Sequence, residues 1–592
     1  MTRGRRKIIL ARTAGFCMGV RRAVKLAMEA ANDPANPVPI RTVGPLIHNR
    51  QVVELLERKG VGVLDDEGQD PGTALIRAHG LPPARKEELQ DTCDKVIDAT
   101  CPHVLKVQRI AQKYSEQGYN CVIVGDRGHA EVRSVLSFAS PRGHVISGPD
   151  EVDELPDFDK VVVVAQTTQN VGMFEHCVEK LRERWPDCKV FDTVCRATQF
   201  RQQEVERLAK KVDAMVIVGG YHSGNTRRLK EISEATGTPT SHVETDDELD
   251  EDWLAEHRTV GVTAGASTPN WMIRRVLRRI RRVHHRQDHS PTELLRNILA
   301  GPIHANFFVG GAAAALTFVN AALMGVSGSS LAACCALAFL FILAQHLLNQ
   351  YTKREAIYLN DPGKAEFFRR HKRSLLVLGI AATVGALVLA AFLGWIVFGL
   401  IALGSAGGIL YRLDLGRELG RRIGLKSIQQ IPGSKELFVG LAWAVTTAFI
   451  PALAMTSGAV DWRALAVAFP ATFILAGQRT LIGDLGDVEG DQLVGRETVA
   501  VVLGPSKSKW LFLVSLLFEV IILALVGGYL GWATTFSYFL LLLVPYAGGL
   551  FLLHHYQRMP EGELGEALID STFYISAILA ALWVWSSWSV PF

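Results

Sequence analysis

The chain has 592 residues, which is too many for one ordinary domain. Its formal net charge of +4 says little about partners because the basic residues are clustered, and no feature calls for a nucleic-acid partner. Its nine cysteines lack the spacing of a small secreted domain, so we expect no disulfide framework.

The apolar residues divide the chain into two parts. Residues 1 to about 290 have the composition of a soluble α/β protein, whereas the chain from about 300 onward consists mostly of long apolar runs. The N-terminal segment is basic and then only briefly apolar, which is not the pattern of a signal peptide. We therefore expect the first part to lie in the cytoplasm.

A cysteine stands at a corner of the predicted fold in the stretch "VIDATCPHVLKV". Val96 and Ile97 end a strand-like run, and Pro102 suits the first turn of a helix. Cys101 is thus predicted to lie between strand and helix, where the positive end of the helix favours a thiolate.

Cys17 and Cys195 occur in the same setting, at intervals of 84 and 94 residues from Cys101. Short apolar runs such as "CVIVGD", "KVVVVAQ" and "AMVIVGG" alternate with helical patterns, which predicts parallel sheets. Ligands of such sheets bind at the carboxyl ends of the strands. Three similar α/β units are therefore predicted to bring three cysteines to one centre.

The usual role of a cysteine is that of a small buried apolar residue. We assign this role to the other six, which are Cys93, Cys121, Cys177, Cys188, Cys334 and Cys335. The absence of paired CxxC motifs argues against a zinc ribbon or a ferredoxin. Three thiolates suit a cubane iron–sulfur cluster, whose fourth iron then remains open to a substrate oxygen.

The polar residues that follow the predicted strands suit a small anionic substrate. Histidines and Ser/Asn loops before helices favour a diphosphate cradle, although a single loop histidine is most often only solvated or capping. Glu131, in "GDRGHAEV", is the candidate proton source for a bound hydroxyl. The candidate substrate-binding residues are His48, His79, His129, Thr168, Ser223, Asn225 and Ser267.

Residues 7 to about 283 resemble the 4-hydroxy-3-methylbut-2-enyl diphosphate reductases (IspH/LytB family) through "AGFCMGV", "RAHG", "DATCPHV", "GHAEV", "QTTQ", "DTVCRATQFRQ", "GNTRRL" and "GASTP". The resemblance implies a three-lobed α/β fold around a [4Fe–4S] cluster held by Cys17, Cys101 and Cys195. It also implies reductive removal of the substrate hydroxyl as water, yielding isopentenyl and dimethylallyl diphosphate, with reduced ferredoxin or flavodoxin as electron donor. By position, the seven residues named above hold the substrate and Glu131 relays the proton.

One position departs from this family's usual pattern. Gly224 stands where a second serine normally precedes the asparagine, so a hydroxyl contact is lost. A glycine N–H can still face a phosphate oxygen, and we expect a modest effect on affinity.

After residue 270 the chain becomes an arginine-rich helical pattern with apolar residues from Ile273 to Val283. It is predicted to close the first domain, and its basic surface also suits anionic lipid. The predicted domains are 1–287, a basic linker at 288–302, and a nine-helix all-α membrane domain at 303–592. The nine apolar runs lie near 303–325, 329–348, 374–393, 394–412, 438–457, 463–482, 511–531, 536–556 and 571–590.

Basic stretches alternate with short, almost uncharged connections along this second part. The positive-inside rule places the basic stretches in the cytoplasm of a bacterial-type inner membrane, with the N-terminal domain inside and the C-terminus outside.

One basic-side connection carries three aspartates, in "GDLGDVEGDQLVGRETVAVVLG". Asp487 and Asp491 stand four residues apart, with Asp484 one turn before, which suits Mg²⁺ bound to a diphosphate. The alternative is a solvated acidic loop. This motif and the nine helices resemble the UbiA superfamily of intramembrane prenyltransferases, which implies that Lys426 and Lys435 contact the diphosphate.

The first aspartate-rich motif of that superfamily is altered here. After Asn349, the positions for aspartates hold Lys353 and Ile357, and only Asp361 further on is acidic. Two hypotheses stay open. Either Lys353 replaces one metal in a transferase that attaches a polyprenyl group to an apolar acceptor, or the domain is a non-catalytic anchor or lipid-binding scaffold.

Overall fold

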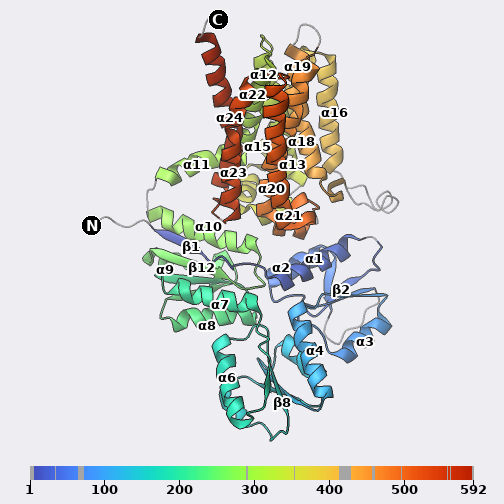
Figure 1. Ribbon diagram of the computed structural model, residues 1–592, viewed down its shortest axis with the longest axis vertical. Coiled ribbons are helices and arrows are strands. Elements are labelled where there is room, and N and C mark those ends of the chain that lie inside the picture. The colour runs from blue at the N-terminus through green and yellow to red at the C-terminus, as the bar shows by residue number, and fades with distance from the viewer. Residues whose placement is uncertain are drawn as a thin grey trace, which may run out of the picture. The chain divides into compact units, whose positions relative to one another are not determined.

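The computed structural model describes residues 6–33, 35–64, 72–287, 291–352, 354–412, 428–455, 460–494, 496–556, 558–560 and 562–589. The chain forms two compact units, Met1–His289 and Ser290–Phe592. The first is an α/β unit and the second is helical (Figure 1).

The first unit contains three four-stranded sheets in which every paired strand is parallel. The first has the order β1 (Lys7–Leu10), β12 (Thr259–Ala264), β10 (Ala214–Val218) and β11 (Thr240–Val243). The second has the order β3 (Val61–Leu64), β2 (Ile40–Val43), β4 (Thr73–Ile76) and β5 (Lys95–Asp98). The third has the order β7 (Gly143–Ile146), β6 (Asn120–Val124), β8 (Val161–Ala165) and β9 (Lys189–Val190).

Central strands β8 and β10 are buried at every residue, as a parallel sheet covered on both faces requires. This explains their unbroken apolar sequences, "VVVVA" and "AMVIV". The helices of the unit are α1 (Met18–Asn32), α2 (Arg50–Arg58), α3 (Pro83–Thr92), α4 (Pro102–Glu116), α5 (Ala130–Phe138), α6 (Val171–Arg184), α7 (Arg196–Ala209), α8 (Gly224–Ala235), α9 (Glu251–Glu256) and α10 (Asn270–Gln287).

The arginine-rich segment forms α10 and closes the first unit, as predicted. Its apolar stripe, Ile273, Val276, Leu277, Ile280 and Val283, packs into the core beside β10 and β12. Most of the segment predicted as a linker, 288–302, lies in a further helix, α11 (Pro291–His304). Glu293, Leu294 and Leu295 are good helix formers, which favours a helix in this segment.

The second unit has eight helices that are long and apolar enough to cross a membrane, in the part of the chain that the structure describes. They cover Phe307–Met324, Leu331–Tyr351, Pro362–Leu393, Ser434–Met455, Trp462–Val488, Val499–Tyr529, Phe536–His555 and Glu563–Ser586. A ninth apolar helix, Trp395–Tyr411, is shorter. The predicted count of nine is therefore approximate, with eight full-length candidates and one short helix.

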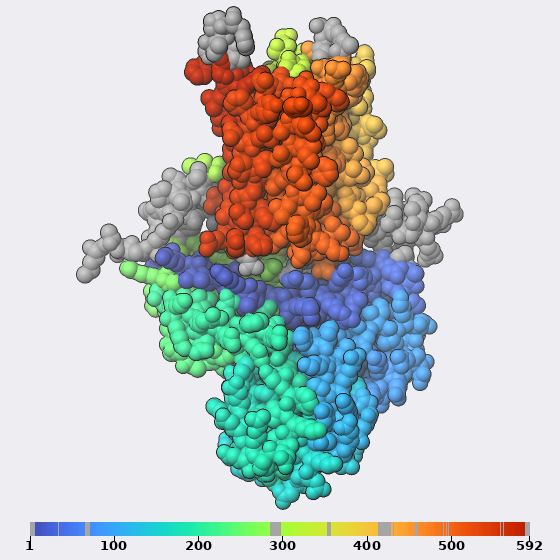
Figure 2. Space-filling model, in the orientation of Figure 1, coloured from blue at the N-terminus to red at the C-terminus, as the bar shows by residue number. Residues whose placement is uncertain are grey.

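The elements of this unit are α12 (Phe307–Met324), α13 (Leu331–Thr352), α14 (Arg354–Asn360), α15 (Pro362–Leu393), α16 (Trp395–Arg412), α18 (Ser434–Ala444), η4 (Val445–Phe449), α19 (Ile450–Met455), α20 (Trp462–Val494), α21 (Val499–Val520), η5 (Ile521–Tyr529), α22 (Phe536–Leu540), α23 (Leu543–His555) and α24 (Glu563–Ser589). In Figure 2 the visible face of the unit is formed by closely packed orange and red helices. Inside it, Asn320 of α12 donates to Thr447 of η4 and Thr472 of α20. Such polar ties are typical between membrane helices.

Candidate functional sites

The three cysteines of the predicted centre occupy the same position in three similar units. Cys17 is the N-cap of α1, Cys101 of α4 and Cys195 of α7, and each follows the last residues of an edge strand. The corner position predicted for Cys101 is thus confirmed. In α4 the missing N–H of Pro102 costs nothing, because the first N–H groups of a helix have no partner within it.

A matching backbone hydrogen bond fixes each cysteine to the loop after a central strand. The three bonds are Cys17 N–H to Ala266 O at 3.1 Å, Cys101 N–H to Ala78 O at 2.9 Å, and Cys195 N–H to Thr167 O at 2.9 Å. The residue after each acceptor is a predicted substrate-binding residue, namely Ser267, His79 and Thr168. One bond per unit therefore brings the backbone of a cysteine next to the residue that precedes a predicted substrate-binding residue.

The thiols converge without forming a site for one ion. A Cβ placed on Gly19 would lie 2.6 Å from the Cys101 sulfur and 3.9 Å from that of Cys17. Of the described residues, however, only His48, His79 and His129 form a group of three or more ligands whose atoms all lie within 4.8 Å of one another. Thiolates on a single zinc would be about 3.8 Å apart. The wider spacing of these cysteines suits a polynuclear cluster.

Burial opposes ionisation of the Cys101 and Cys195 thiols. It raises the pKa of Cys101 to about 11, and the N–H groups of His103 and Val104 offset this only in part. Burial also raises the pKa of Cys195. The helix N–H groups thus favour the thiolate of Cys101, as expected, but burial outweighs them, and the sequence pattern did not reveal that burial. A coordinated metal would reverse this balance, since coordination deprotonates a thiol.

His48, His79 and His129 meet at one point although they come from three different loops. Their ring centroids are 4.4 to 5.3 Å apart. Burial lowers the pKa of His48 and of His129 to about 4, and that of His79 also falls well below its usual value. The three imidazoles are therefore neutral at pH 7. His48 Nε2 and His79 Nδ1 are buried without a hydrogen-bond partner, which suits a site that a polar ligand completes.

The cavity beside this histidine cluster is lined by cations. It has a volume of about 790 Å³, and Arg77, Arg127, Arg133 and Arg227 line it together with His48 and His129. Several arginines around a concave surface favour a phosphate-containing ligand. The four arginines were not among the predicted site residues, because their sequence neighbourhoods do not separate them from solvated surface arginines.

Glu131 is 2% exposed and lies next to the cysteine centre. Its carboxylate accepts hydrogen bonds from the backbone N–H of Thr167 at 2.7 Å and from the Thr167 hydroxyl at 2.9 Å. Thr167 also accepts the bond from Cys195, so one residue connects the carboxyl to a thiol-bearing corner. Burial raises the pKa of Glu131 to about 7, despite the two hydrogen bonds that lower it. The group can therefore hold or release a proton near neutrality.

The remaining predicted residues lie at loop ends around the same centre. Ser223 caps α8, and Ser267 donates to the backbone oxygen of His48 at 3.1 Å. Asn225 is 4% exposed, and neither its side-chain oxygen nor its nitrogen has a partner. A Cβ on Gly224 would meet Thr168 Oγ1 at 3.7 Å, an ordinary contact, so a serine would fit there. Steric crowding therefore does not explain why position 224 is a glycine.

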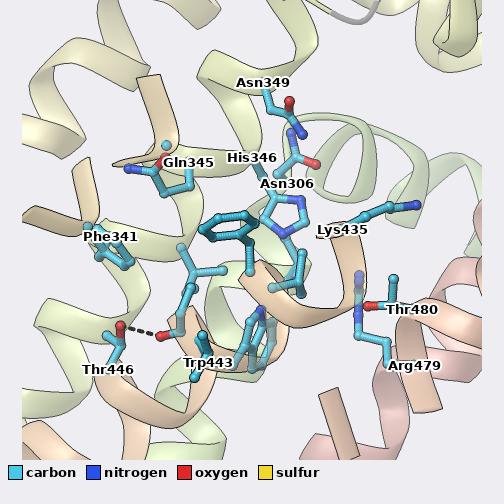
Figure 3. Close-up of a pocket in the computed structure, with 18 of the residues that line it drawn as sticks. Asn306, Phe341, Gln345, His346, Asn349, Lys435, Trp443, Thr446, Arg479 and Thr480 are labelled. Carbon is cyan, nitrogen blue, oxygen red and sulfur yellow. Dashed lines mark hydrogen bonds between the residues drawn. The ribbon is translucent and has the colours of Figure 1, made fainter. Parts of the chain in front are cut away.

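A second candidate site lies inside the helical unit. An apolar cavity of about 640 Å³ is lined by residues such as Phe341, Leu400 and Trp443, and charged residues gather at one end of it. Figure 3 shows Asn306, His346 and Asn349 close together on one side, with Lys435 and Arg479 on another. A polar recess of about 180 Å³ shares several of these residues. An apolar chamber with a charged end suits an amphipathic molecule with an anionic head.

The aspartates of α20 are partly paired with cations of the chain. Lys435 forms an ion pair with Asp484, whereas Arg496 and Asn360 contact Asp491 at 3.1 and 3.2 Å. Asp487 lines both the cavity and the recess. Asp484 and Asp491 each keep one buried oxygen without a hydrogen-bond partner, so the donor set suits one divalent ion.

The remaining predicted residues of the membrane unit lie around the cavity or outside the described residues. Asn349 lines the cavity, and Asp361 caps α15 by accepting from the N–H groups of Gly363 and Lys364. Lys353 and Lys426 lie outside the described residues. The cavity also contains cations that sequence reasoning missed, Lys364 and Arg479, which pair with Glu566 at 2.8 Å and Asp570 at 2.5 Å. Lys364 was missed because it lies in a basic stretch between two apolar runs, where a lysine is normally explained by the positive-inside rule.

Known proteins match the two units separately. The family model described as LytB protein matches residues 8–281, and that of the UbiA prenyltransferase family matches residues 369–578. The 4-hydroxy-3-methylbut-2-enyl diphosphate reductase of Trichlorobacter lovleyi is 44% identical over 280 residues, which are 47% of this chain and 99% of that protein. The reductase of Geobacter sulfurreducens is 44% identical over 275 residues, 46% of this chain and 96% of the relative.

Solved structures also match each unit. A structure of (E)-4-hydroxy-3-methyl-but-2-enyl diphosphate reductase is 41% identical, with 47% of this chain and 99% of that chain covered and a TM-score of 0.38. A UbiA homolog from Archaeoglobus fulgidus bound to GPP and Mg²⁺ is 16% identical, with 48% and 97% covered and a TM-score of 0.35.

The fold and sites define a fusion of an α/β unit that carries a cysteine centre with a multi-pass helical membrane unit. Since the chain covers nearly the whole length of relatives that are 44% identical to it, it belongs to the LytB protein family. Its second unit carries a UbiA prenyltransferase domain.

Gly19→Ala should displace the Cys101 sulfur, because the added Cβ would lie 2.6 Å from it. Alanine favours a helix over glycine by about 1 kcal/mol, so the fold itself should not suffer. After anaerobic reconstitution with iron and sulfide, we expect Gly19→Ala to bind less than half of the iron that the parent protein binds, whereas Gly148→Ala, where a Cβ meets nothing within 4 Å, should match the parent. Full iron content in Gly19→Ala would show that the sulfur position does not matter.

Glu131→Gln should alter the pH dependence of stability. A folded-state pKa of about 7, raised from 4.5, means that wild-type stability is fully present below pH 4.5 and falls as the pH rises to about 7. The amide cannot ionise. Between these pH values the free energy of unfolding should therefore fall by up to about 3 kcal/mol less in the variant than in the wild type. Denaturant unfolding at pH 4.5 and 7.5 measures the difference, and parallel pH profiles would contradict the assignment.

Proposed function

We propose that the first unit reduces 4-hydroxy-3-methylbut-2-enyl diphosphate to isopentenyl and dimethylallyl diphosphate. The observation that carries the proposal is the meeting of three N-cap cysteines with a buried, proton-holding carboxyl beside an arginine-lined cavity. The named activity of the relatives supports it.

The donor set fits a [4Fe–4S] cluster held by Cys17, Cys101 and Cys195. Three thiols, too widely spaced for one ion, account for three iron positions of such a cluster. When bound, the cluster supplies electrons and an iron that is open to a substrate oxygen. Reduced ferredoxin or flavodoxin is the electron donor that we propose.

Different residues of the first unit then bind the diphosphate, orient the substrate and deliver the proton. Arg77, Arg227 and the loop that carries Ser223 and Asn225 bind the diphosphate through charge-assisted and neutral hydrogen bonds. The neutral histidines orient the substrate, together with Thr168 and Ser267. Glu131 holds a proton within the protein interior and delivers it to the leaving hydroxyl, which departs as water.

For the membrane unit we propose transfer of a polyprenyl group from its diphosphate to an apolar acceptor. The apolar cavity accommodates the prenyl chain, and its charged end accommodates the diphosphate. Asp484, Asp487 and Asp491 would hold one Mg²⁺ there. A simple anchor has no use for an apolar cavity lined by three cations and their carboxylate partners, which favours transfer over the alternative.

We also propose that the membrane is a bacterial-type inner membrane. The basic connections would lie in the cytoplasm with the reductase unit, and the C-terminus outside. The products of the first unit are the five-carbon precursors of prenyl diphosphates, so the two proposed activities belong to the same branch of metabolism.

Glu131→Gln should separate cluster assembly from turnover. The amide retains the shape of the carboxyl but carries no proton to donate, so we expect unchanged iron content and a rate at least about a hundredfold lower. Glu179→Gln, an exposed position on α6, serves as the matched control. Product formation is measured by mass spectrometry with a chemical reductant, and wild-type turnover in Glu131→Gln would remove this residue from the mechanism.

Asp487→Asn should abolish prenyl transfer without affecting the reductase. It removes one carboxylate ligand at the charged end of the cavity, and we expect at least a tenfold fall in the prenylated lipid. Asp461→Asn is the control, because Asp461 only caps the other end of α20 and asparagine caps equally well. Identical lipid profiles in all three strains would instead support the anchor.

A further inference from the structure

Each of the three cysteines of the centre lies at a junction between two of the three sheets. Cys17 follows β1 of the first sheet and precedes α1, which leads into β2 of the second sheet. Cys101 lies in the same way between the second sheet and the third, and Cys195 between the third and the first. No single sheet therefore fixes the distance between two sulfur atoms, and this distance depends on contacts that cross the junctions.

A buried arginine joins the helix of one cysteine to the loop of another. Arg201 lies on α7, six residues after Cys195, and is 4% exposed. Its Nη2 donates at 2.6 Å to the backbone oxygen of Gly15, which stands two residues before Cys17. Its Nη1 donates at 3.1 Å to the backbone oxygen of Ala264, at the end of the strand β12 that pairs with β1. One guanidinium thus holds the Cys17 corner against the helix that Cys195 begins.

Arg22 repeats this arrangement at the next junction. It lies on α1, five residues after Cys17, and donates to the backbone oxygens of Thr100 at 3.1 Å and Asp98 at 3.2 Å. Both acceptors lie within the three residues before Cys101. Because Arg22 is exposed, water competes for its donors, and we expect a smaller contribution from it than from the buried arginine.

The chemistry of arginine suits this role. A guanidinium presents several N–H donors in a rigid plane, so it can bond to two backbone oxygens at once, and it stays protonated inside a protein. Hydrogen bonds and charge around an iron–sulfur cluster affect its reduction potential. Reduction adds a negative charge to the cluster, and a cation held near it in the protein interior stabilises that charge.

We propose that Arg201 is a positioning residue of the cysteine centre, which fixes the Cys17 corner relative to Cys195 and whose charge favours the reduced form of the cluster. The inference rests on the cluster that we propose for the first unit. Arg22 acts in the same way between the Cys17 and Cys101 corners. Both arginines act through the backbone that carries the thiols, so neither is a metal ligand.

The test uses the full chain in detergent, purified without oxygen and reconstituted with iron and sulfide. Arg201→Met removes the donors and the charge, whereas Arg201→Lys keeps the charge but replaces the planar group by a single ammonium. Arg207→Met, at an exposed position on the same helix, is the control. Iron analysis measures the cluster content, and a redox titration followed by electron paramagnetic resonance measures the midpoint potential.

We expect Arg201→Met to bind less than half of the iron that the parent binds. In the cluster that remains, the equilibrium constant for reduction should fall about tenfold, which shifts the midpoint potential by about 59 mV to more negative values. Arg201→Lys should also bind less iron but keep a potential closer to that of the parent, because the charge is retained. Arg207→Met should match the parent in both measurements.

Parent-like iron content and midpoint potential in Arg201→Met would overturn the inference, even with a lower melting temperature, because that result describes a purely structural residue. If Arg201→Met does not fold, Arg22→Met decides, since an exposed side chain is less important for folding. Reduced iron content in Arg22→Met then supports the inference, and parent-like iron content contradicts it. A parent chain that binds no cluster would contradict the proposed function itself, whereas an active parent with unchanged arginine variants contradicts only this inference.

Discussion

Three backbone hydrogen bonds hold the centre of the first unit together. In each, the N–H of an N-cap cysteine donates to the loop after a central strand, at Ala78, Thr167 or Ala266. Because the sheets share one strand order, the same bond recurs three times and the thiols approach one another. The residues that follow these acceptors are three of the predicted substrate-binding residues, so the same three bonds position both the proposed cluster ligands and three proposed substrate contacts.

Burial has opposite consequences for the groups at this centre. It keeps the histidines neutral, keeps a proton on Glu131 near pH 7, and opposes the thiolate form of Cys101. Neutral imidazoles and a protonated carboxyl suit the binding and protonation of a hydroxyl. Buried thiols without metal are costly to ionise, so metal binding and stability of this unit should be coupled.

Much of this arrangement follows from the sequence. Valine-rich runs predicted β8 and β10, and Pro102 revealed the corner at Cys101. Effects of tertiary packing could not be predicted from the sequence, since the pKa of Cys101 depends on atoms that are distant along the chain. The same holds for Arg201, whose guanidinium bonds to the backbone oxygens of Gly15 and Ala264. In the membrane unit the pairing of Lys364 with Glu566 joins residues 202 positions apart, which no local pattern reveals.

The central claim is that three cysteines from three similar units hold one cluster with an open iron. Mössbauer spectroscopy of the full chain, purified without oxygen after growth on iron-57, tests it most directly. The account predicts three thiolate-bound irons and one distinct iron whose signal shifts when the hydroxylated diphosphate is added. Four equivalent irons that do not respond to the diphosphate would contradict it.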